Sequence, residues 1–209
     1  MSEPSQFYTG LVVPLYGPLR SAVPDPEPYA RFVSRSGEPG LELGCGTGDP
    51  LLDLVARGLD VEGLDSSADM LEQCRVAAQE RAIDVVLHHQ RMEHMDLGRR
   101  FRSIYIAGPS FNLLPDDLMA HSALQRIEAH LAVGGCALIP LFVPEPVRDL
   151  GKAREHVESD GTLLRFIALH RDRILDGGSV TEAELDAAVA RLESHLATPS
   201  TVVLYATFF

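Results

Sequence analysis

The sequence predicts an α/β fold with a doubly wound, mostly parallel sheet, and three observations support this. Short apolar runs that suit strands alternate with segments whose apolar residues recur at helical spacing, a pattern typical of parallel sheets covered by helices. The chain has 209 residues, 45% of them hydrophobic, which is enough for one well-packed domain. Three glycines at alternate positions, Gly44, Gly46 and Gly48, directly follow the first apolar run.

Five apolar runs account for the predicted sheet. A Gly134-Gly135 turn leads into the last of them. Pro140 interrupts that run, and because proline cannot donate a ladder hydrogen bond, we expect a bulge or an exposed side there. The predicted strands are residues 41–43, 61–64, 85–87, 104–107 and 137–143.

Capping residues mark the helices between these strands. We expect Asp49 to cap the first helix and Gly58 to end it. Ser66 and Asp69 resemble a capping box that opens the second helix. A third helix is expected over residues 118–131.

The carboxyl-terminal third predicts further elements. Residues 161–175 suit an added strand or hairpin, and a capping box at Thr181 opens a helix that extends to residue 196. A last strand is expected over residues 202–209. Its apolar end should not be left in water, so it is a central strand, a dimer contact or the cut end of a longer protein.

Charge and composition restrict the partners. The formal net charge of -12 opposes a nucleic-acid partner, because binding a phosphate backbone depends on Lys and Arg, and small molecules are favoured. Without an apolar stretch of roughly 18 residues or a signal-peptide pattern at the start, we expect a cytoplasmic protein with no membrane partner. Cys45, Cys74 and Cys136 are far apart and odd in number, which argues against disulfides and structural zinc.

The glycine turn and Asp65 together predict a nucleoside pocket. Glycines let the backbone turn tightly and approach a ligand closely. Asp65 ends the second apolar run, seventeen residues after Gly48, a separation that fits one helix and one strand. Its carboxylate is therefore expected to reach the diol of a ribose that lies over the turn.

These residues resemble a class I S-adenosylmethionine-dependent methyltransferase of the small-molecule type. The match lies in residues 41–48 (LELGCGTG), in residues 63–67 with Met70 and Leu71, and in residues 131–135. The resemblance implies a Rossmann-like methyltransferase fold, S-adenosylmethionine as the cofactor, and methyl transfer to an oxygen or nitrogen of a small-molecule acceptor.

The resemblance also implies roles for the residues of the turn. Gly44, Gly46 and Gly48 would surround the methionine moiety of the cofactor, and Asp65 would hold its ribose hydroxyls. Glu42 would steer the ammonium group of the cofactor or order the loop.

On the adenine side, the resemblance implies that Ser66 and Met70 flank one face of the base. Arg91 stands where the family often has an acidic residue, and an arginine cannot accept a hydrogen bond from the adenine amine. Either the backbone around Met92 reads that edge or Glu93 replaces the missing carboxylate. The complete set implied for the cofactor is Glu42, Gly44, Cys45, Gly46, Gly48, Asp65, Ser66, Met70, Arg91, Met92, Glu93 and Ala107.

Many prolines in residues 1–37 predict an amino-terminal arm or lid, and the remaining residues, 38–209, would form the cofactor-binding methyltransferase domain. Within that domain residues 144–178 are a possible substrate-side insertion. The family usually closes its sheet with an antiparallel pair, whereas this chain offers one clear strand and a short carboxyl end. A homodimer is possible.

Four residues are candidates for the acceptor side. Ser110 and Asn112 follow the fourth strand at the carboxyl edge of the sheet, where α/β folds bind ligands, or they only cap the turn into the next helix. Tyr8 and Tyr16 could fold over the sulfonium, or they anchor the arm by packing. No catalytic residue is assigned, because only a hydroxyl or ammonium acceptor needs a base.

Other interpretations explain fewer of these sequence features. His88 and His89 are adjacent on a strand and point to opposite faces, so with His94 they do not form a metal site. Cys45 is packing in the loop rather than a nucleophile. A nicotinamide-dependent oxidoreductase would need a Gly-x-Gly-x-x-Gly spacing that the turn lacks. A non-catalytic relative that keeps the nucleoside pocket is the remaining alternative.

Overall fold

A computed structural model describes Tyr8, Thr9, Val13 and residues 23–140 in full, and the strands at residues 153–157, 163–169 and 201–207 without their side chains. Tyr16 and the helix expected from Thr181 lie outside the described residues. The chain divides into two compact units. The first is Met1–Val13 with Ser21–Phe142, and the second is Pro14–Arg20 with Val143–Phe209.

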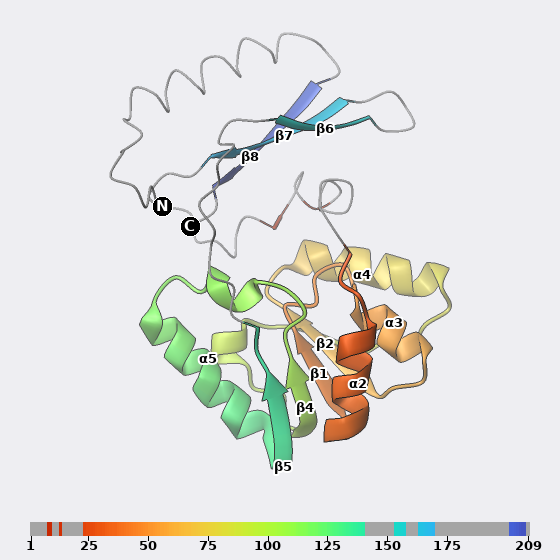
Figure 1. The fold of residues 1–209 in the computed structure, drawn as a ribbon, viewed down its shortest axis with the longest axis vertical. Helices are drawn as coiled ribbons and strands as arrows, with labels where there is room; N and C mark the ends of the chain where they lie inside the picture. Colours follow the sequence, from red (N-terminus) through yellow and green to blue (C-terminus); the bar gives the residue numbers. More distant parts are fainter. Residues whose placement is uncertain are drawn as a thin grey trace. The chain divides into compact units, whose positions relative to one another are not determined.

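The first unit contains a five-stranded sheet in which every neighbouring pair is parallel (Figure 1). The strand order is β3-β2-β1-β4-β5, so the chain winds outward from β1 in both directions. This order confirms the doubly wound fold. The strands are β1 (Gly40–Leu43), β2 (Val61–Asp65), β3 (Leu87–His89), β4 (Phe101–Tyr105) and β5 (Leu131–Leu138).

Helices cover both faces of this sheet. Three of them pack on one face and the fourth packs on the other (Figure 1). Along β1, Leu41 and Leu43 face the second core while Glu42 faces the first, as the alternation of a strand requires. None of the described helices has the length and apolar content that a membrane crossing requires. The first face carries α2 (Glu27–Ser36), α3 (Leu51–Ala56) and α4 (Ala68–Glu80), and the second carries α5 (Asp117–His130).

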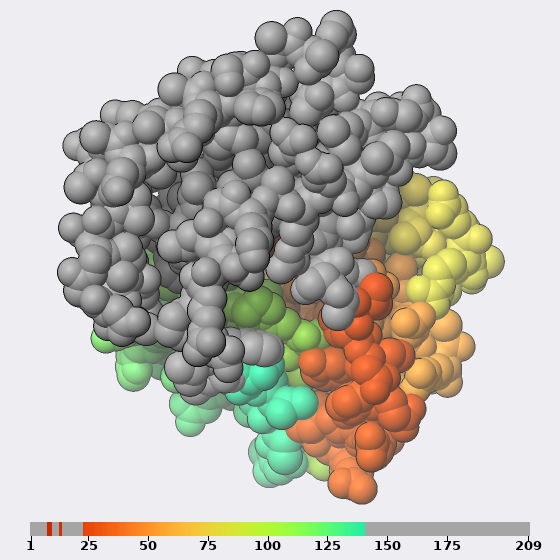
Figure 2. Space-filling view, turned by 45° about the horizontal axis from the view of Figure 1, so that its top comes forward, coloured from red at the N-terminus to blue at the C-terminus, as the bar shows by residue number. Residues whose placement is uncertain are grey.

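Helix α2 occupies part of the segment predicted to be an arm. Ala30 and Val33 are buried in the first core, and the outer face of the helix lies at the molecular surface (Figure 2). Residues 27–36 are therefore a core helix of the first unit. The role of a lid for the preceding residues stays a prediction.

Two helix starts differ from the expectation. Pro50, not Asp49, is the N-cap of α3, and no side chain caps this end. Ser67, not Ser66, caps α4, and its Oγ accepts a hydrogen bond from the N–H of Met70 at 3.1 Å. Ser67 has the extended backbone that an N-cap requires, and it stands three residues before the donor. Two adjacent serines leave this choice open in the sequence.

The fifth and third strands lie elsewhere than expected. β5 begins at Leu131 and contains Gly134 and Gly135. A step of five residues along β5 (131 to 136) lies opposite a step of two along β4 (101 to 103), which makes a bulge in β5. Gly134 adopts a φ of 72°, which accommodates this bulge. Pro140 lies beyond the end of the strand. β3 starts two residues late, since Val86 is exposed and pairing begins at Leu87.

The second unit contains a three-stranded sheet in the order β6-β7-β8. β6 (Ala153–Val157) pairs antiparallel with β7 (Leu163–Leu169), which is the added strand expected within residues 161–175. β8 (Thr201–Thr207) pairs parallel with β7 and lies at the edge of the described sheet rather than at its centre.

Candidate functional site

The glycine turn is fixed to the neighbouring strand by its backbone. The N–H groups of Gly44 and Cys45 donate to the carbonyl of Leu64 in β2, at 2.7 and 3.1 Å. Gly46 has a φ of 53° and Gly48 a φ of 101°, and this left-handed conformation favours glycine at both positions. The loop therefore holds a defined shape at the carboxyl end of the sheet.

Asp65 contacts this loop directly. Its Oδ2 accepts a hydrogen bond from the N–H of Gly46 at 2.8 Å, and its Oδ1 accepts one from the N–H of Ser67 at 2.8 Å. Burial raises the pKa of Asp65, although these N–H donors act in the opposite direction. Each carboxylate oxygen can accept a second hydrogen bond, so the group can still receive two hydroxyl donors.

Glu42 is a fully buried carboxylate beneath the loop. Its Oε2 accepts a hydrogen bond from the hydroxyl of Tyr105 at 2.8 Å. Its Oε1 is the one buried side-chain oxygen or nitrogen without a hydrogen-bond partner among the described residues. Burial raises the pKa of Glu42 from 4.5 to about 8, and the charges of Asp49 and Asp65 add to the rise, while the bond from Tyr105 opposes it.

Two aromatic residues that the sequence did not single out pack on Tyr105, the partner of this carboxyl group. The ring of Tyr29 stacks on that of Tyr105 with centroids 5.4 Å apart, and Phe32 meets Tyr105 edge-on at 6.5 Å. The hydroxyl of Tyr29 donates to the carbonyl of Ala107 at 2.9 Å. In the sequence, a tyrosine inside an apolar strand was the available signal for a buried polar contact. Its partner is revealed only by the strand register, which pairs Tyr105 with Glu42.

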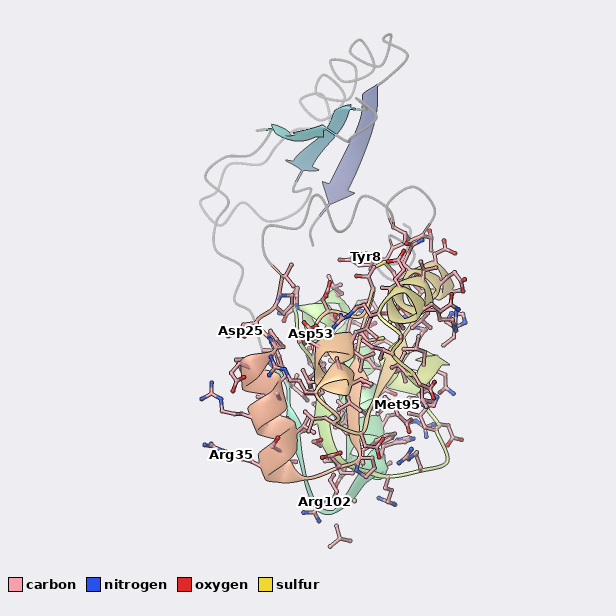
Figure 3. All side chains as sticks on the ribbon, turned by 90° about the vertical axis from the view of Figure 1, so that its right-hand side faces the viewer. Tyr8, Asp25, Arg35, Asp53, Met95 and Arg102 are labelled. Atoms are coloured by element: carbon pink, nitrogen blue, oxygen red, sulfur yellow. The ribbon has the colours of Figure 1, made fainter. Side chains whose placement is uncertain are left out.

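On the predicted adenine side, Met70 is buried and its Cε lies 3.3 Å from the place where a Cβ on Gly46 would stand. Ser66 is exposed, and its carbonyl oxygen lies 3.0 Å from Nε2 of His89. Ser67, which the sequence analysis did not assign, donates its hydroxyl to the carbonyl of Tyr8. Tyr8 therefore lies beside the start of α4, at the end of the sheet opposite Arg102 (Figure 3).

The segment after β3 contains both candidates for binding the adenine edge, Glu93 and the backbone around Met92. Arg91 forms an ion pair with Glu93, which is buried, so that carboxylate is already engaged. The side chain of Met92 packs in the second core. Both alternatives for the adenine edge, Glu93 and the backbone around Met92, stay predictions.

The acceptor-side candidates lie differently. Oγ of Ser110 stands 2.6 Å from the place where a Cβ on Gly44 would be, so Ser110 packs on the glycine loop. Asn112 is exposed. The N-cap of α5 is Asp116, whose Oδ1 accepts a hydrogen bond from the N–H of Met119 at 2.8 Å. The alternative that Ser110 and Asn112 only cap the turn before this helix stays a prediction.

Cysteine and histidine side chains face other partners. Cys45 is buried, burial raises the pKa of its thiol well above the usual value, and all three cysteines are free. Because Sγ of Cys45 points at Gly63 in the core, only its backbone belongs to the loop. Nε2 of His88 lies 2.6 Å from Glu62. Within the described part of the chain, no three His, Cys, Asp or Glu residues are grouped as metal ligands.

The sheet order, the glycine loop after β1 and the acid at the end of β2 define a class I S-adenosylmethionine-dependent methyltransferase domain. Residues 41–135 match the family described as methyltransferase domain. The class predicted from the sequence is confirmed.

Two curated relatives show the extent of the similarity. The chain is 34% identical over 151 residues to dTDP-3-amino-3,6-dideoxy-alpha-D-glucopyranose N,N-dimethyltransferase of Streptomyces fradiae, covering 72% of this chain and 56% of the relative. It is 29% identical to dTDP-3-amino-3,4,6-trideoxy-alpha-D-glucopyranose N,N-dimethyltransferase of Streptomyces venezuelae, covering 72% of this chain and 60% of the relative. The matches thus span little more than half of each curated relative.

Among solved structures, the CcbJ methyltransferase from Streptomyces caelestis aligns with a TM-score of 0.59 and 26% identity. The alignment covers 64% of this chain and 56% of that protein.

Proposed function

We propose that this protein transfers methyl groups from S-adenosylmethionine to the amino nitrogen of a nucleotide-linked amino sugar. The observation that carries the cofactor part is the buried Oε1 of Glu42, which lacks a partner beneath a glycine loop held by Asp65. The nitrogen acceptor is supported by two relatives that are N,N-dimethyltransferases of dTDP-linked 3-amino sugars.

The residues of the site fit this cofactor. A buried carboxylate oxygen without a donor favours a cationic ligand group, and the ammonium of the methionine moiety is one. The carboxylate of Asp65 keeps acceptor capacity for the two ribose hydroxyls. Met70 covers the loop at Gly46, where it can contact the adenine. When bound, the cofactor supplies a methyl group that its sulfonium has already activated.

The chain has to align the acceptor nitrogen with that methyl group and exclude water. We expect Ser110, which packs on the glycine loop, and Tyr8, whose carbonyl accepts a hydrogen bond from Ser67, to take part in binding the acceptor. Asn112 is an exposed third candidate. The amine must reach the methyl group unprotonated, since an ammonium has no free electron pair.

The test is an assay with S-adenosylmethionine and a dTDP-linked 3-amino sugar. We expect release of S-adenosylhomocysteine and a sugar product that carries one and then two added methyl groups, detected by mass spectrometry. The matched control is the same sugar nucleotide with a hydroxyl in place of the amine, which should yield neither product.

The outcomes separate the alternatives. Methylation of the hydroxyl analogue would contradict the nitrogen acceptor and leave the cofactor assignment intact. Binding of S-adenosylmethionine without turnover of any acceptor would identify the non-catalytic relative. Binding of NADH in its place would identify the oxidoreductase, for which the glycine spacing gives no support.

A further inference from the structure

We infer that Tyr105 is a positioning residue whose hydroxyl fixes the Glu42 carboxylate so that Oε1 is presented to the ammonium group of the cofactor. The inference rests on the proposed use of S-adenosylmethionine. It deepens that proposal by giving a role to a residue of β4, a strand outside the glycine loop.

The first argument is the pairing of the two side chains across the sheet. Glu42 in β1 and Tyr105 in β4 are direct register partners on adjacent parallel strands, and both are fully buried. A phenol has a single proton to donate, and the hydroxyl of Tyr105 donates it in a hydrogen bond to Oε2 of Glu42, with 2.8 Å between the two oxygens. One carboxylate oxygen is therefore held in place and the other is left without a partner.

The second argument is the charge of the ligand group that Oε1 can bind. An ionised, buried carboxylate oxygen without a donor is costly in a medium of low dielectric, which is why the pKa of Glu42 in the free protein is raised to about 8. A cationic ligand group that donates hydrogen bonds to Oε1 favours the ionised form. Asp49 and Asp65 act on Glu42 with the same negative sign. The combined field excludes an anionic group and favours a cation.

The third argument is that Tyr105 is itself held. Its ring stacks on Tyr29 with an angle of 24° between the planes and meets Phe32 at 72°, so α2 supports it from two sides. The hydroxyl of Tyr29 is in turn anchored on the carbonyl of Ala107. A carboxylate that must point one way benefits from a donor whose own orientation is fixed.

The experiment compares two ligands by calorimetric titration. S-adenosylhomocysteine carries the ammonium group, whereas 5′-methylthioadenosine shares the adenosine and thioether but lacks the amino-acid end. We expect Tyr105→Phe to weaken binding of S-adenosylhomocysteine about tenfold, as for one hydrogen bond to a charged group, and to leave binding of 5′-methylthioadenosine unchanged.

Ser103→Ala is the matched control. Ser103 is fully buried on the same face of β4 as Tyr105. The substitution removes one hydrogen bond, which the hydroxyl of Ser103 donates to the carbonyl of Gly37 at 3.0 Å. It should lower the melting temperature and keep the ratio of the two affinities. A second route is Tyr105→Phe in a Glu42→Gln background, where no buried charge is left unpaired. If Tyr105 acts through Glu42, removal of its hydroxyl in the Glu42→Gln variant causes no further change in the ratio of the two ligand affinities.

The results are separable. Equal weakening of both ligands by Tyr105→Phe, or a further change of the ratio in the Glu42→Gln background, would overturn the positioning role while leaving the proposed cofactor in place. Failure of the unaltered protein to bind either ligand would overturn the proposed function and the inference with it.

Discussion

Asp65 does two things at once. Its carboxylate joins the glycine loop to the start of α4 through the N–H groups of Gly46 and Ser67, and it keeps acceptor sites for a ligand. A role in ribose binding was predicted from the sequence, but the structural role was not, because it depends on the position of two backbone N–H groups. Replacing Asp65 therefore affects both ligand affinity and local stability.

We expect Asp65→Ala to weaken S-adenosylhomocysteine binding by about 1.5 to 3 kcal/mol, the contribution of hydrogen bonds to a charged group. It should also lower the free energy of unfolding, since two N–H groups lose their acceptor. Calorimetric titration and urea unfolding measure the two effects. Unchanged affinity in a folded variant would contradict the assignment of the ribose to Asp65.

Glu42 makes stability depend on pH. Because burial raises its pKa from 4.5 to about 8, the folded state holds a proton more tightly than the unfolded state. The stabilisation is fully present below pH 4.5 and is lost as the pH rises toward 8. Relative to Glu42→Gln, the unaltered protein should lose up to about 1.4 kcal/mol per pH unit within that window.

Urea unfolding of both proteins at pH 5 and pH 8 checks this sign. The other titrating groups are common to the two proteins and cancel in the difference. Curves that stay parallel over the whole window would show that Glu42 is ionised in the folded state at low pH.

At the scale of elements, the glycine loop depends on both its backbone conformation and the space around it. A Cβ on Gly48 would lie 2.8 Å from Sγ of Cys74 and 2.8 Å from Cγ of Leu52. Gly58, after α3, has a similarly positive φ of 83° but nothing within 4 Å of such a Cβ. A comparison of Gly48 with Gly58 therefore separates the cost of backbone strain from the cost of side-chain crowding.

We predict that Gly58→Ala costs about 1 to 2 kcal/mol of unfolding free energy, from backbone strain alone. Gly48→Ala should cost that amount plus about 1 to 3 kcal/mol from overpacking. Unfolding by urea measures both variants. Equal losses would mean that Cys74 and Leu52 move aside without cost.

The elements also show what local patterns can specify. Strands 41–43 and 61–64 were predicted nearly in place, because each is buried on both faces of the sheet. β4 covers residues 101–105 rather than the predicted 104–107, so the prediction missed its start by three residues. The edge strands β3 and β5 were misplaced. An edge strand has one neighbour, so its limits follow the register with that neighbour rather than its own hydrophobicity.

At the scale of the whole molecule, the alternation of strands and helices and the order of motifs were enough to predict the doubly wound sheet and its class. The Glu42–Tyr105 contact was not predictable in the same way. It joins residues 63 positions apart, and only the placement of β4 beside β1 brings them together. The possible homodimer and the substrate-side role of residues 144–178 stay predictions.

Ligand binding should stabilise the entire first unit. At a concentration of S-adenosylhomocysteine about 100 times its dissociation constant, the gain is about 2.7 kcal/mol, which corresponds to a rise in melting temperature of about 5 to 10 °C. NADH at the same concentration is the control and should produce no shift. Differential scanning fluorimetry measures both, and a shift with NADH alone would contradict the methyltransferase assignment.

The stacked pair Tyr29 and Tyr105 has a practical consequence. The chain contains no tryptophan and five tyrosines, so its near-ultraviolet circular dichroism is dominated by phenol chromophores. Two of the five touch each other, and one of these donates a hydrogen bond to the carboxyl group of Glu42. We therefore expect a ligand bound at Glu42 to change this spectrum, an intrinsic optical signal that needs no dye or label.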